Sequence, residues 1–246
     1  MDFTFYFFES VSFENSSIFE DISKSFEVPE SVETLNVSGS DFQDLEILNK
    51  NCFRNLKTLI AKRCKGLRLP KTFPKSVKKL EFSESVFDNE HIAEKMVGAK
   101  DALEEYQKAH PEANLCEYGT DYSDERKQWK SRENERDRNK FLVDSNAFKG
   151  KFWEKNVGEG GLELDFLDVV NCTGIDYNNG FDPFVLWVSS LKSVSEVVID
   201  LSHKSTNCEK LSFLNALYGK NCANISDHFV KKLKFERKLF LQEGCY

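Results

Sequence analysis

Apolar residues recur along this chain in one six-residue pattern: the first, fourth and sixth positions are apolar and the residues between them are mostly polar. The copies begin at Val32, Leu56, Val77, Leu164, Val194 and Val230. Alternation at the last three positions is typical of a short strand with one buried face. Because each copy is too small to bury its apolar side alone, the repetition predicts strands stacked side by side, each covering its neighbour.

The shorter intervals between copies predict two different connections. After the first copy, Asp41 is suited to cap a short helix that carries Leu45, Leu48 and Cys52 inward. In the next interval, Pro70 and Pro74 favour an extended or single-turn return, because each removes a backbone donor and disfavours a preceding helix.

Three longer helices are predicted by capping residues followed by apolar residues at helical spacing. They begin after Asp88 or Asn89, at Asp182-Pro183, and after Asn207, where Gly219 provides a stop. Their expected inward faces are Ile92, Met96, Ala99, Leu103 and Tyr106; Phe184, Trp187, Val188 and Leu191; and Leu211, Leu214, Leu217 and Tyr218. Strands that alternate with helices predict an α/β fold with a parallel sheet.

Two segments interrupt the repeats and divide the chain. The alternating Phe3, Phe5 and Phe7, with Val11 further on, predict one or two edge strands that seal the first repeat. Residues 123–140 mix both charge signs densely around Trp129, which predicts a solvated helix or mobile arm. The expected organisation is an N-terminal cap at 1–31, repeats at 32–110, a charged insertion at 111–160, and further repeats with a C-terminal cap at 161–246.

The copies resemble leucine-rich repeats, whose signature is L-x-x-L-x-L-x-x-N/C-x-L. Two copies carry Cys64 and Cys172 at the ninth position and are similar to the cysteine-containing repeats of F-box proteins. The other ninth residues are Ser40, Ser85, Ser202 and Lys238. The resemblance implies an α/β leucine-rich-repeat solenoid, a curved parallel sheet with helices or extended returns on its convex side, here with an inserted charged helical arm. Too few residues precede Val32 for an F-box module, so a ubiquitin-ligase role is not implied.

In such a sheet the third and fifth residues of each copy point away from the core and form two continuous columns. The third-position column is Thr34, Thr58, Lys79, Phe166, Glu196 and Lys232, and the fifth-position column is Asn36, Ile60, Glu81, Asp168, Val198 and Lys234. Ile60, Phe166 and Val198 are apolar among charged neighbours, so they are the candidate anchors for a protein partner. The alternative is an ordinary solvated sheet face, or a face covered by the inserted arm.

Composition and charge narrow the function classes. The chain has 246 residues, of which 40% are hydrophobic and 30% charged, and its net charge is −7. This charge argues against general binding of nucleic acid or anionic membrane. The arm at 123–140 offers basic residues and Trp129 for a contact with RNA, but its interleaved acidic residues favour a solvated helix or a protein-docking arm, with Trp129 as its anchor. No apolar stretch reaches the ~20 residues that a membrane-spanning helix needs.

Seven cysteines without a C-x-x-C pair or a secretory signal predict reduced thiols in a cytoplasmic protein, with a nuclear or organellar location left open. Their spacing does not suit zinc, so burial is favoured, and no metal or cofactor is expected. Cys222, Asp227 and His228 lie close in sequence, but the chain has no phosphate loop, G-x-S-x-G or H-E-x-x-H.

The sequence therefore predicts a non-enzymatic adaptor or assembly subunit that binds a protein through the concave face of its repeats. The alternative is a subunit of a ribonucleoprotein or large organellar complex, docked partly through residues 123–140.

Overall fold

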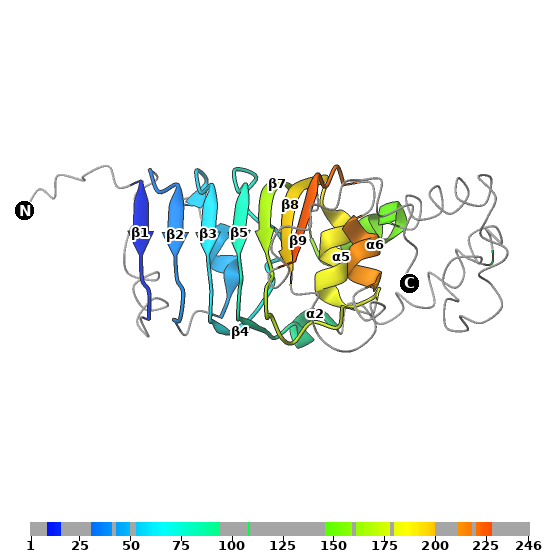
Figure 1. The fold of residues 1–246 in the computed structure, drawn as a ribbon, viewed down its shortest axis with the longest axis horizontal. Coiled ribbons are helices and arrows are strands. Elements are labelled where there is room, and N and C mark those ends of the chain that lie inside the picture. The colour runs from blue at the N-terminus through cyan, green and yellow to red at the C-terminus, as the bar shows by residue number, and fades with distance from the viewer. Residues whose placement is uncertain are drawn as a thin grey trace, which may run out of the picture.

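A computed structural model describes residues 9–15, 31–40, 43–49, 53–93, 108, 146–158, 161–177, 180–199, 211–217 and 220–227. Within them, seven strands form one sheet in the order β1-β2-β3-β5-β7-β8-β9, and every neighbouring pair is parallel. The strands are β1 (Ser10–Ser12), β2 (Thr34–Asn36), β3 (Thr58–Ile60), β5 (Lys79–Glu81), β7 (Glu163–Asp168), β8 (Ser193–Ile199) and β9 (Asn224–Asp227). Figure 1 shows them as a single row, with most of the helical ribbon near the C-terminal strands. The fold is α/β with a parallel sheet.

Equivalent positions of the first five copies lie side by side in this sheet. Leu35 pairs with Leu59, Leu59 with Leu80, Leu80 with Leu167, and Leu167 with Val197. All five side chains are fully buried. The alignment predicted from the six-residue spacing is therefore confirmed for these copies, including the pairing of β5 with β7 across the long interval between them.

The predicted place of the sixth copy, which begins at Val230, next to β8 is wrong. The place beside β8 belongs to β9, in which Ile225 pairs with Val197 and is buried. Residues 230–235 lie outside the described part of the chain. The segment 224–227 has a single apolar residue, so the six-residue pattern could not find it. Residues 230–235 were chosen instead because their apolar residues fit the pattern.

At the other end of the sheet, the predicted edge strand is confirmed as β1. Its Val11 pairs with Leu35, which extends the same ladder by one strand. Phe3, Phe5 and Phe7 lie outside the described residues.

Each of the first five strands in the row is followed by the same turn. The residue four positions after the inward-facing residue of the ladder, which is the eighth position of a copy, has a positive φ between 54° and 67°; these residues are Asn15, Gly39, Arg63, Glu84 and Asn171. A left-handed residue reverses the chain direction sharply, and it is uncommon outside glycine. The turn was not predicted, because Arg63 and Glu84 carry no sequence signal for it.

The four ninth residues in the described ranges are buried, and their side chains hydrogen-bond to the backbone. The donors and acceptors are Ser40 Oγ to Val37 O (2.5 Å), Cys64 Sγ to Val37 O (3.2 Å), Ser85 Oγ to Ala61 O (2.7 Å) and Cys172 Sγ to Phe82 O (3.0 Å). Ser85 Oγ also accepts a hydrogen bond from the Cys64 amide at 3.0 Å. Three of these four bonds join one copy to the preceding copy, so a small polar or thiol side chain ties successive turns together.

Two connections between neighbouring strands lie on the apolar side of the sheet, where the sequence predicts a short helix and then an extended return. The first is a 3₁₀ helix, η1 (Leu45–Asn49), with Leu45 and Leu48 buried. Its first turn is capped by Asp44, which accepts from the Glu46 amide at 2.9 Å, and the predicted cap Asp41 lies outside the described residues. The next connection contains no helix between residues 68 and 76, as its prolines predict. It leads on from β4 (Lys65–Leu67), which pairs with β6 (Val86–Phe87).

Two later helices begin where the sequence predicts. α2 (Glu90–Ala93) follows Asp88 and Asn89, and Ile92 is buried; the rest of this predicted helix lies outside the described residues. α5 (Pro183–Ser190) starts with Asp182 accepting from the Phe184 amide at 2.8 Å. The predicted stripe is confirmed, but Val185 and Leu186 are also buried, so this helix is enclosed by protein rather than half exposed.

The described part of the last helix, α6 (Leu211–Leu217), buries Phe213, Ala216 and Leu217. Leu214, predicted inward, is only partly buried. Residues 146–156, at the end of the predicted charged insertion, also form a helix, and its Trp153 is fully buried in the core. The remainder of the insertion, including Trp129, lies outside the described residues.

Candidate functional site

The two predicted columns are present on the outward face of the sheet, the face opposite the buried ladder. The third-position column runs Ser10, Thr34, Thr58, Lys79, Phe166 and Glu196, and the fifth-position column runs Ser12, Asn36, Ile60, Glu81, Asp168 and Val198. Ten predicted members occupy their expected places. Lys232 and Lys234 do not, because β9 puts Asn224 and Ser226 beside β8.

A network of charges occupies the centre of this face, on and just after β3, β5 and β7. We call Lys62, Lys79, Glu81, Ser83 and Asp168 the central network. Lys79 Nζ lies 2.7 Å from Glu81 Oε1, and Lys62 Nζ contacts the other Glu81 oxygen. Lys62 Nζ also lies 3.9 Å from Asp168 Oδ2, which accepts a hydrogen bond from Ser83 Oγ.

The two carboxylates of the central network are nearly covered, with exposed fractions of 8% for Glu81 and 9% for Asp168. Asp168 Oδ1 is also held, since it accepts from the Val170 amide at 3.1 Å. Buried charges are tolerated only when paired and hydrogen-bonded, as these are. The network therefore gives the face a fixed, electrically balanced centre.

Apolar side chains flank the central network on both sides. In the fifth-position column, Ile60 precedes Glu81, and Val198 follows Asp168. In the third-position column, the Phe166 ring lies beneath Lys79, whose Nζ is 5.0 Å from the ring centroid. Ile60, Phe166 and Val198 are all half-buried, so part of each remains open to a partner.

The ionisation of Glu81 makes the central network sensitive to acid. Burial alone would raise the pKa of Glu81, but hydrogen bonds and positive charge from Lys62 and Lys79 outweigh it and leave the pKa below its ordinary value of 4.5. A lowered pKa means that the ionised group stabilises the fold above pH 4.5 and that this contribution is lost as the pH falls below it.

We expect Glu81→Gln to reduce the free energy of unfolding by less than about 1 kcal/mol at neutral pH, because the network is reached by solvent at its lysines. The difference from the wild type should shrink as the pH falls below 4.5 and through the lowered pKa of Glu81, because the carboxyl group then becomes protonated in the folded chain as well as in the unfolded one. Urea unfolding at neutral pH and at a series of acid pH values measures this change. A difference that stays constant with pH would show that the carboxylate charge contributes nothing.

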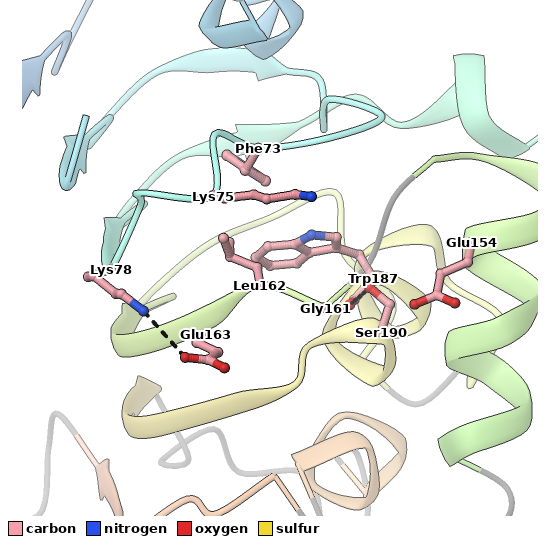
Figure 2. Close-up of a pocket in the computed structure, with 9 residues that line it drawn as sticks. All are labelled: Phe73, Lys75, Lys78, Glu154, Gly161, Leu162, Glu163, Trp187 and Ser190. Carbon is pink, nitrogen blue, oxygen red and sulfur yellow. Dashed lines mark hydrogen bonds and ion pairs between the residues drawn. The ribbon is translucent and has the colours of Figure 1, made fainter. Parts of the chain in front are cut away.

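A separate pocket of about 540 Å³ lies at the side of the sheet. It is lined by Phe73, Lys75, Lys78, Glu154, Gly161, Leu162, Glu163, Trp187 and Ser190. In Figure 2 the side chain of Lys75 runs across the indole of Trp187, and Lys78 meets Glu163 at 3.6 Å. The lining combines two lysines and two glutamates, and the Ser190 hydroxyl donates to Trp187 O at 2.6 Å. The hydroxyl of Ser190 is therefore already used in a hydrogen bond to the backbone, and no histidine or cysteine is among the residues that line the pocket.

Two of the three cysteines in the described residues, Cys64 and Cys172, are buried. Burial raises the pKa of Cys172 to about 12, and burial also raises the pKa of Cys64. Both are therefore neutral near pH 7 and poor nucleophiles. Cys222 is half-buried, and His228, its predicted neighbour, lies outside the described residues. Within the described ranges, no three His, Cys, Asp or Glu side chains gather as metal ligands.

Two members of the central network were missed by the sequence reasoning. Lys62 and Ser83 occupy the seventh position of their copies, two residues beyond the fifth, and the strand alternation continues that far. Extending the columns by one outward position would have found them. The pocket residues come from four separate segments, and no spacing in the sequence brings these together.

No protein-family model, curated protein or solved structure matches this chain. None of the helices in the described residues is long and apolar enough to cross a membrane. The site is therefore interpreted from its own geometry.

Proposed function

We propose that this chain is a leucine-rich-repeat solenoid that acts as a non-enzymatic adaptor or assembly subunit and binds a protein partner on the outward, concave face of its sheet. The observation that carries the proposal is the register of the two columns, which brings Ile60, Phe166 and Val198 together around the central network.

The solenoid part of the proposal rests on what repeats from strand to strand. Five copies align in register, a left-handed residue follows the strands at the eighth position, and the ninth residue bonds back to the backbone. Each copy buries its apolar residues on its neighbours, which is the physical requirement of a repeat stack.

The binding part rests on the composition of the face. Protein interfaces combine apolar anchors with a polar rim, and a few anchors, often aromatic, account for most of the affinity. Phe166 and Val198 on one side of the central network and Ile60 on the other match that arrangement. The charges between them are already paired within the chain, so docking leaves no carboxylate of the network without a cation. A preformed sheet also loses little conformational entropy on binding.

The double variant Phe166→Glu, Ile60→Glu tests the proposal. It places two charges where the apolar anchors stand, and we expect the affinity for the partner to fall by at least about 30-fold, equivalent to ~2 kcal/mol. Affinity purification with the wild type identifies the partner, and titration with the purified partner then measures the loss.

The matched control is Val86→Glu, which adds a charge at an apolar residue that is 42% exposed and lies on β6, outside the seven-stranded sheet. It should bind like the wild type. Thermal unfolding of all three proteins checks that each is folded. Partners retained by the folded double variant would remove the outward face as the binding surface.

A further inference from the structure

The acidic residues on the outward face and at its margin are not neutralised equally. Glu81 contacts Lys62 and Lys79 within the central network. At the margin, Glu163 contacts Lys78 and Lys192. Glu196 differs from them, because no cation of the described residues lies within ion-pair distance of its carboxylate.

Glu196 stands in a distinctive setting on the face. It pairs directly with Phe166 on β7, and Val198 follows two residues later on the same side of β8. On the far side of the Phe166 ring, the Lys79 ammonium is 5.0 Å from the centroid and is held by Glu81 at 2.7 Å. The row Lys79, Phe166, Glu196 therefore runs from a neutralised cation across an aromatic ring to a carboxylate that has no counter-charge in the described part of the chain.

We propose that this position accepts an arginine side chain of the protein partner, with its guanidinium on the Glu196 carboxylate and its stem on Phe166 and Val198. The inference deepens the proposed function and depends on it. A guanidinium pairs with a carboxylate through two parallel hydrogen bonds and also packs against aromatic rings, which an ammonium does less well. The apolar stem of arginine suits the Phe166 and Val198 surface.

Charge complementarity excludes an anionic occupant here. Lys62 and Lys79, the cations of the central network, are engaged by Glu81, so an incoming carboxylate or phosphate would meet Glu196 without gaining a free cation. The competing cationic occupant is the chain's own segment 231–238, which contains Lys231, Lys232, Lys234, Arg237 and Lys238.

The experiment selects binders to the full-length chain from a phage-displayed library of random peptides. The wild type should enrich peptides that contain arginine next to apolar residues. Glu196→Lys should lose these peptides and enrich acidic ones instead. Glu196→Gln should bind a synthetic copy of the best peptide about two- to fivefold more weakly, as expected for the loss of one exposed ion pair.

The matched control is Glu9→Lys, the same charge change at an exposed residue beside β1, which should select the wild-type peptides. Identical selection by the wild type and Glu196→Lys would overturn the arginine site, while the proposed function would stand if Phe166→Glu, Ile60→Glu lost those peptides. Retention by that double variant too would overturn both. The last arm uses a synthetic peptide of residues 228–246. If this peptide displaces the selected peptides from the wild type but does not bind Glu196→Lys, the occupant is the chain's own segment, and the proposal of an arginine from a partner protein is overturned.

Discussion

Replacing Leu80 by alanine is expected to lower the free energy of unfolding by about 3–5 kcal/mol, the upper range for a buried leucine. Leu80 lies on β5, in the middle of the ladder between Leu59 and Leu167, and it is fully buried. Parallel neighbours on both sides fix the backbone, so the surrounding side chains cannot close the cavity left by the missing methyl groups. Chemical denaturation followed by circular dichroism measures the change.

The adjacent Lys79→Ala is the control for this substitution. Lys79 sits on the same strand but points outward, where it contacts Glu81 and the Phe166 ring. Loss of these partly exposed contacts should cost about 1 kcal/mol. Equal destabilisation by the two variants would contradict the division of β5 into a buried and an outward face.

The register of the sheet was readable from the sequence because two constraints act together. Strand alternation fixes which residues face the core, and the repeated spacing fixes which residues meet, since a slip of one position would expose the whole apolar set. Leu35, Leu59, Leu80, Leu167 and Val197 satisfy both constraints, and they align as predicted. The positions of Phe166 and Ile60 on the outward face follow from the same two constraints.

Features that depend on contacts between distant segments were not readable. β9 contains only Ile225 as an apolar residue, and it is a strand because the edge of β8 supplies its hydrogen-bond partners. Trp153 follows a highly charged stretch, yet it lies in the core beneath the sheet. The central network joins Lys62 to Asp168 at 3.9 Å, two residues that are far apart along the chain. Contacts between single residues that are far apart in sequence produce no repeated spacing, so the sequence pattern could not predict them.

The glycines show how tightly one turn packs on the next. Gly66 and Gly174 occupy the same position, two residues after Cys64 and Cys172, and both have positive φ, +71° and +76°. The third copy has Phe87 at this position, and in the pairing of β4 with β6 the register shifts between Lys65 and Leu67. At Gly174, the backbone of the preceding copy approaches so closely that a Cβ atom would overlap the carbonyl oxygen of Phe87.

We therefore expect Gly174→Ala to lower the free energy of unfolding by about 3 kcal/mol or more. About 1 kcal/mol comes from holding an alanine at positive φ, and the rest from moving the Phe87 backbone, whose amide bonds to Thr173 O at 2.9 Å. Gly161→Ala separates the two terms, because Gly161 has φ +81° and nothing within 4 Å of an added Cβ. It should cost only the conformational part, about 1 kcal/mol. Urea unfolding of the two variants compares them directly. If Gly174→Ala were no more destabilising than Gly161→Ala, then the copies that begin at Val77 and Leu164 would not pack on one another as closely as the geometry requires.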